Sequence, residues 1–174
     1  MKFLDLFRDM SGEIWEANMD ISHKGLTSLE GMPKVIFGSL DCSRNKLTSL
    51  KGMPKVITGN FDCSVNKLSS LLGMANYIGG DFNCNVNKLT SIKSIANNIG
   101  GAFDCSCNNL RSLRGMPTTI NGNFNCSLNS LTSLDSMADY VGGYFNCNYN
   151  NLTSLDGMAN SVGGDFDCSD NKLT

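Results

Sequence analysis

The stretch Phe61-Asp62-Cys63-Ser64-Val65-Asn66-Lys67-Leu68 decides the fold, because the chain carries seven in-register copies of its pattern without an insertion. An asparagine follows each cysteine by three residues and a leucine follows it by five. The cysteines stand 21 residues apart, at Cys42, Cys63, Cys84, Cys105, Cys126, Cys147 and Cys168. An internal repeat of this length is typical of a solenoid, in which each unit forms one coil and buries its apolar face against its neighbours.

Each unit predicts a short strand followed by a turn. Phe and Cys alternate with polar residues, so the strand has one inward face. We expect the Asn to turn the chain and to satisfy backbone groups that the bend leaves unpaired. Met19 and Ile21 continue the pattern upstream, which gives eight parallel strands. Pro33, Pro54 and Pro117 predict irregular or short 3₁₀ structure on the convex side.

The core of the unit, Phe-x-Cys-x-x-Asn-x-Leu, resembles the Leu-x-Leu-x-x-Asn/Cys-x-Leu stretch of leucine-rich repeats over residues 18–174. The unit is most similar to the short repeats, of roughly 20 to 22 residues, of bacteriophage proteins and bacterial effectors. The first leucine of the family pattern is absent, and Ile57 and its equivalents, one residue earlier, replace it. The resemblance implies a curved solenoid with little helix and with the parallel sheet on its concave face.

We expect one leucine-rich-repeat domain over residues 1–174, with an N-terminal cap over 1–12 and the repeats over 13–174. Phe3, Phe7 and Met10 recur at helical spacing, which predicts a short amphipathic helix that covers the first coil together with Trp15.

The other end of the array predicts self-association. Phe166, Cys168 and Leu173 belong to the last coil, and no C-terminal cap is expected after them. An uncovered coil exposes apolar side chains and unpaired strand groups, so we expect a homodimer through the C-terminal coils.

Composition argues against several classes of function. The net charge is −2, and the chain lacks the excess of Lys and Arg that nucleic-acid binding requires. His23 is the single histidine, so we expect no metal site, no cofactor and no enzyme activity. Asp5 and Arg8 interrupt any export signal, and no apolar window approaches the ~18 residues of a membrane span. We therefore expect a cytoplasmic protein with no membrane partner.

The eight cysteines are interpreted as free thiols. Stacked strands hold neighbouring inward cysteines side by side, in a poor geometry for disulfides, and a buried thiol packs as a small hydrophobe. Cys107 lies outside the inward row and is expected on the surface.

A second candidate site lies on the outward face of the sheet, which is the concave binding surface of such solenoids. The position immediately before the turn Asn varies most in chemistry: His23, Arg44, Val65, Val86, Cys107, Leu128, Tyr149 and Asp170. An exposed apolar stripe in its middle would be explained by a partner. The alternative is that these side chains lean over the turn and are covered by their neighbours. We predict a partner-binding surface of Arg44, Val65, Val86, Cys107, Leu128 and Tyr149, with Tyr144 nearby.

Charge divides along the chain. Residues 1–23 carry a net charge of −3, residues 24–93 one of +5 and residues 94–174 one of −4. Lys46, Lys67 and Lys88 follow the turn Asn and form a basic rim beside the stripe. This polarity would attract a partner of complementary pattern, or a second copy in the opposite orientation.

Three hypotheses for function result. The first is a non-catalytic protein-binding module; the resemblance to phage and effector repeats implies that it inhibits or sequesters a host protein. The second is a structural or assembly protein that binds copies of itself. The third is an acidic mimic of nucleic acid, because Asp or Asn recurs directly before each inward cysteine.

Overall fold

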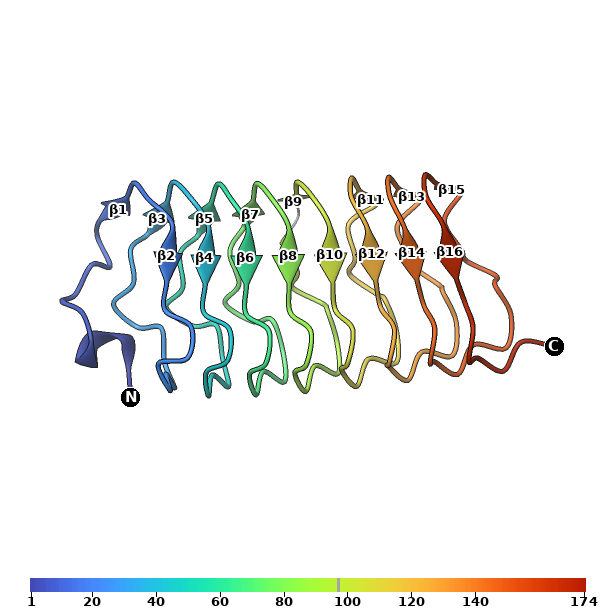
Figure 1. Ribbon diagram of the computed structural model, residues 1–174, viewed down its shortest axis with the longest axis horizontal. Helices are drawn as coiled ribbons and strands as arrows, with labels where there is room; N and C mark the ends of the chain where they lie inside the picture. Colours follow the sequence, from blue (N-terminus) through green and yellow to red (C-terminus); the bar gives the residue numbers. More distant parts are fainter. Residues whose placement is uncertain (97) are drawn as a thin grey trace.

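The computed structural model describes residues 1–96 and 98–174 and shows a β-solenoid that repeats every 21 residues (Figure 1). One strand from each coil joins an eight-stranded parallel sheet in chain order. Its strands are β2 (Met19–Asp20), β4 (Leu40–Asp41), β6 (Phe61–Asp62), β8 (Phe82–Asn83), β10 (Phe103–Asp104), β12 (Phe124–Asn125), β14 (Phe145–Asn146) and β16 (Phe166–Asp167). Equivalent residues lie opposite one another, as Phe103 does to Phe82 and Phe124. The predicted eight parallel strands are confirmed.

Each coil also contains a second strand, which the sequence analysis missed. These strands are β1 (Ile14–Trp15), β3 (Val35–Ile36), β5 (Val56–Ile57), β7 (Tyr77–Ile78), β9 (Asn98–Ile99), β11 (Thr119–Ile120), β13 (Tyr140–Val141) and β15 (Ser161–Val162). They form a five-stranded and a three-stranded parallel sheet. The expectation of irregular or 3₁₀ structure away from the first sheet was wrong here. Stacked coils can pair their backbones over only two residues, too short a run for a period-two pattern to show.

A glycine-containing bend connects the two strands of most coils. The Gly100 N–H donates to the Ile78 carbonyl at 3.0 Å, so the bends of neighbouring coils lie directly on one another. A Cβ atom at Gly100 would collide with the backbone carbonyl of Gly79 in the coil before. Glycine is therefore required at this bend for close stacking.

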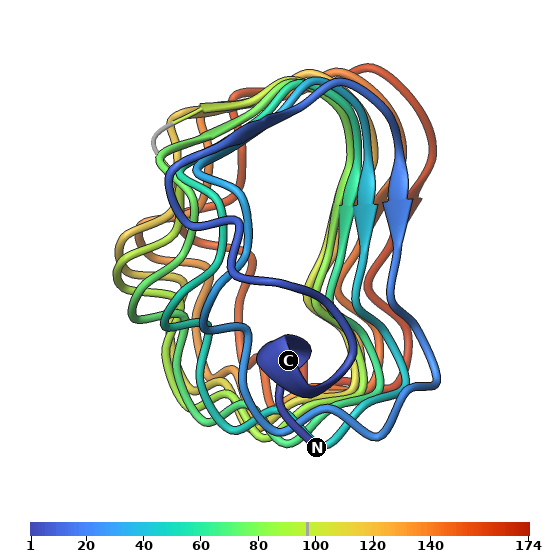
Figure 2. The ribbon, with the colours of Figure 1, turned by 90° about the vertical axis from the view of Figure 1, so that its left-hand side faces the viewer.

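Inward side chains fill the space between the sheets in continuous rows. The rings of Phe61, Phe82, Phe103, Phe124, Phe145 and Phe166 stack with centroids 5.1 to 5.6 Å apart. The cysteine and leucine rows are buried beside them. In the end view of Figure 2, the first and last strands of the eight-stranded sheet project beyond the middle ones, so its outer face is shallowly concave.

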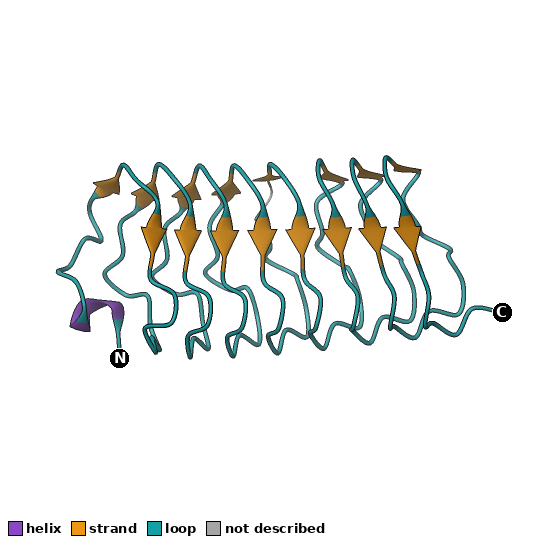
Figure 3. Cartoon of the chain, viewed as in Figure 1, coloured by secondary structure: helices purple, strands orange, loops and turns teal. Residues whose placement is uncertain are grey.

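The N-terminal cap differs from the predicted helix over 1–12. The only helical element in the described residues is a 3₁₀ turn, η1 (Phe3–Asp5), coloured purple in Figure 3. Phe3 and Met10 are buried against the first coil, whereas Phe7 and Trp15 are partly exposed. Backbone pairing with the first coil replaces helix propagation: the Phe3 and Met10 N–H groups donate to Ser28 and Gly31. So short a helix gains too few internal bonds to compete.

A ladder of turn asparagines ties each coil to the one before it. The N–H of a leucine or isoleucine-row neighbour 19 residues earlier donates to each Asn Oδ1 at 2.8 to 3.0 Å. Each Nδ2 donates to a carbonyl 24 residues earlier at 2.9 to 3.1 Å and to two carbonyls of its own turn, as Asn108 does to Cys84, Cys105 and Ser106. The predicted role of Asn in satisfying the bend is confirmed.

Replacing Asn108 with Ala should lower the free energy of unfolding by roughly 1 to 3 kcal/mol, because buried amides and carbonyls of two coils lose their partner. Thermal and urea unfolding measure the change. The matched control is Asn109→Ala at the next, exposed position, which should unfold like the wild type. Equal effects of the two substitutions would show that the ladder does not stabilise the fold.

Candidate functional site

Two outward rows of the eight-stranded sheet are occupied with holding the backbone. The Asp or Asn before each inward cysteine accepts, through Oδ1, the N–H two residues on at 2.7 to 3.1 Å. This hydrogen bond is the main cause that lowers the pKa of Asp20 and of Asp167. The row is therefore a series of Asx turns. Carboxylates engaged in this way offer less free charge to a nucleic-acid mimic.

The row at the start of the strands has a similar role. Asn18 Oδ1 accepts the N–H of Ser39, and Asn60 Oδ1 accepts that of Asp81, one coil further on. Ala102 and Tyr144 stand in this row without an oxygen at that position. Tyr144 is half-buried, and its pKa is raised by burial and then by Asp167 and Asp165.

The position before the turn Asn has a backbone conformation that its residues do not favour. All eight residues of this row have φ between 50° and 55°: His23, Arg44, Val65, Val86, Cys107, Leu128, Tyr149 and Asp170. We call this the left-handed row. For residues other than glycine this conformation costs about 1 to 2 kcal/mol, and β-branched valine adopts it least readily.

The apolar side chains of the left-handed row reach the surface. Val86 is 46%, Leu128 48% and Tyr149 53% exposed, while Val65 and Cys107 are half-buried. The alternative that neighbours cover these side chains is wrong for Val86, Leu128 and Tyr149. The structure therefore brings together the predicted surface residues as one stripe along the edge of the concave sheet, with Arg44 exposed at its beginning and Tyr144 on the sheet beside its end.

Folding alone does not explain these residues. The chain contains 18 glycines and uses several at other turns with positive φ, such as Gly52 and Gly73. At the left-handed row it instead has large apolar or charged side chains at every coil. Strain concentrated in exposed side chains is a feature of functional sites. Sequence reasoning found the stripe by its variability but had no signal for the strain.

The stripe is electrostatically asymmetric. Lys46, Lys67 and Lys88 are exposed two residues further along the first coils of the stripe, and none of them forms an ion pair within residues 1–96 and 98–174. Asp170 ends the left-handed row, near Asp165 and Asp167 on the last strand. The stripe is thus basic at one end, apolar in its middle and acidic at the other end.

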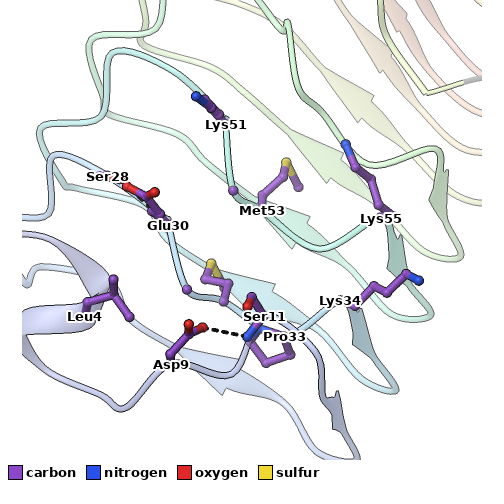
Figure 4. A pocket seen from close by; sticks show the side chains of 13 residues that line it. Leu4, Asp9, Ser11, Ser28, Glu30, Pro33, Lys34, Lys51, Met53 and Lys55 are labelled. Carbon is purple, nitrogen blue, oxygen red and sulfur yellow. Dashed lines mark hydrogen bonds between the residues drawn. The ribbon is translucent and has the colours of Figure 1, made fainter.

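Two surface hollows lie elsewhere. One of about 360 Å³ on the eight-stranded sheet is lined by polar residues that include Asp41, Asp62 and Asp81. Another of about 700 Å³ lies between the N-terminal segment and the first coils, with Met32 and Met53 in its lining and lysines around it (Figure 4). In the described part of the chain, no three His, Cys, Asp or Glu residues are grouped to hold a metal ion.

All eight cysteines are free, as predicted. Burial raises the pKa of the thiols in the inward row, that of Cys147 to about 12 with a further contribution from Cys168 and Asp167. The expectation that Cys107 is the exception was incomplete, because Cys168 in the last coil is also only half-buried.

The predicted self-association residues are less buried than their equivalents. Phe145 and Cys147 are buried, whereas Phe166 and Cys168 one coil later are half-buried and Leu173 is 40% exposed.

Comparison with protein-family models, with curated proteins and with solved structures gave no match for this chain. Among the described residues, no helix is both long and apolar enough to span a membrane. The repeat architecture is therefore assigned from the chain's own coil geometry.

Replacing Val86 with Gly should stabilise the fold by about 0.5 to 1 kcal/mol, because glycine adopts positive φ without strain. Urea unfolding measures the gain. Thr132→Gly, at an exposed position outside the positive-φ set, is the matched control and should destabilise by a similar amount. A loss of stability in the Val86 variant would mean that its side chain stabilises the turn.

Thiol titration should give eight reactive groups in denaturant without reductant, and in the native protein Cys107 and Cys168 should react well before the six others. Fewer than eight groups in freshly prepared, air-protected protein would contradict the free-thiol assignment. Cys107→Ser should remove one fast-reacting group, whereas Cys105→Ser should leave the fast phase unchanged.

Proposed function

We propose that the protein is a non-catalytic protein-binding module that recognises its partner through the left-handed row and the adjoining concave sheet. The observation that carries the proposal is the exposure of Val86, Leu128 and Tyr149 on a strained backbone. Apolar side chains in such positions reduce both stability and solubility, and a partner that buries them accounts for their presence.

The likeness of the repeats to those of phage proteins and bacterial effectors extends the proposal to the kind of partner. We infer a host protein that the module inhibits or sequesters. Eight free thiols support a reducing compartment such as the cytoplasm as the place where this occurs. Leucine-rich-repeat ancestry is part of the same proposal and is supported by the strand, the Asn turn and the concave sheet.

Self-association through the last coil is the second candidate. It is supported by the partial exposure of Phe166, Cys168 and Leu173. Asp165, Asp167 and Asp170 would oppose contact between two such ends, so added salt should strengthen the dimer. Light scattering on a size-exclusion column at two salt concentrations tests it, and a monomer near 18.8 kDa throughout would refute it.

Capture of a partner from host lysate should depend on the stripe. The double variant Leu128→Ser/Tyr149→Ser should lose the captured protein, because two large apolar contacts at an interface contribute about 2 kcal/mol or more each. Mass spectrometry of the retained proteins and calorimetry with the purified partner measure the loss.

The matched control is Leu72→Ser/Tyr140→Ser, which removes exposed apolar side chains of the same kinds from other rows. It should capture like the wild type, and circular dichroism should show both variants folded. Equal capture by the wild type and the stripe variant would place the binding surface elsewhere and refute the proposal.

A further inference from the structure

The dimensions and charges of the left-handed row restrict what can bind along it. Arg44 and Asp170 are six coils apart, and parallel strands are spaced by about 4.8 Å, so the row is about 29 Å long. A helix of about 20 residues has this length. The apolar part, from Val65 to Tyr149, covers four coil steps, or about 19 Å.

Spacing distinguishes a helix from an extended segment. Residues on one face of an α-helix recur every 5.4 Å on average, and the i, i+3 step of 4.5 Å is close to the coil spacing. The mismatch with the row is about 0.6 Å per coil and about 2.4 Å over its apolar part. Residues on one face of an extended segment recur every ~6.6 Å, and the mismatch grows to about 7 Å. A helix can therefore place one apolar side chain at each coil, whereas an extended segment cannot.

Charge fixes the direction and composition of the helix. The N-terminus of a helix carries partial positive charge and the C-terminus partial negative charge. Asp170 with Asp165 and Asp167 favours the N-terminus, although Lys172 offsets one of these charges. Arg44, Lys46, Lys67 and Lys88 favour the C-terminus and acidic side chains in that half.

We propose that the partner binds through an amphipathic α-helix along the left-handed row, with its acidic C-terminal half beside Lys46, Lys67 and Lys88. This inference rests on the proposed function and names the segment that the module recognises. Each apolar residue of the helix contacts the stripe between two neighbouring coils, which explains why every coil from Val65 to Tyr149 has an apolar side chain there.

Selection from a displayed library of random peptides of about 20 residues tests the inference. Wild-type protein is the target, and the Leu128→Ser/Tyr149→Ser variant removes peptides that bind elsewhere. Selected peptides should have apolar residues at i, i+3 or i+4 and i+7, with Asp and Glu in the C-terminal half. Period-two alternation, or a basic C-terminal half, would overturn the inference.

A selected peptide, made synthetically, provides a second readout. It should become helical on binding by circular dichroism, and Lys67→Glu/Lys88→Glu should weaken its affinity about tenfold or more. Lys34→Glu/Lys55→Glu, which reverses charges beside the larger hollow, is the matched control and should bind like the wild type. An unaffected affinity in the first variant would refute the charge assignment.

The outcome is distinguishable from failure of the proposed function. If no peptide prefers the wild type to the stripe variant, the helix inference is wrong, while stripe-dependent capture from lysate still supports a protein-binding surface of another kind. If capture is also independent of the stripe, both are wrong.

Discussion

Hydrogen bonding between coils at a constant 21-residue offset is the constraint on which the rest of the structure depends. Strand pairs, glycine bends and turn asparagines all bond to the equivalent part of a neighbouring coil. An insertion in one unit would shift every later contact, so side chains are placed in rows by the backbone and not by individual packing choices. Each row then has a single environment, and its residues can be compared as alternatives for the same position.

This comparison separates rows that stabilise the fold from the row that does not. The Phe, Cys and Leu rows vary little because each fills a closed layer of the core. The Asn and Asp/Asn rows vary little because their side chains complete the backbone at the turn. The left-handed row varies from arginine to tyrosine although its backbone would favour glycine or asparagine. Different side chains at one strained position indicate a requirement from outside the fold.

The same geometry determines which chemistry is available. The inward thiols are buried, and their pKa values are raised, so they are unsuited to metal binding or nucleophilic catalysis. Carboxylates of the Asp/Asn row accept backbone N–H groups and are spread one to a coil. An apolar stripe with a basic rim, by contrast, matches the composition of protein interfaces, in which apolar contacts supply affinity and charges supply orientation.

The sequence by itself determined the repeat, the eight-stranded parallel sheet, the inward rows and the bonding role of Asn, because all of these follow from a period of 21 and an alternation of two. It also located the stripe from Arg44 to Tyr149. Only the tertiary structure decided what depends on contacts between coils. The second sheet has two-residue strands without a sequence period, and Phe3 to Met10 pair with the first coil instead of forming a helix. The positive φ of the stripe is likewise imposed by the turn, since no local preference of valine, leucine or tyrosine would produce it.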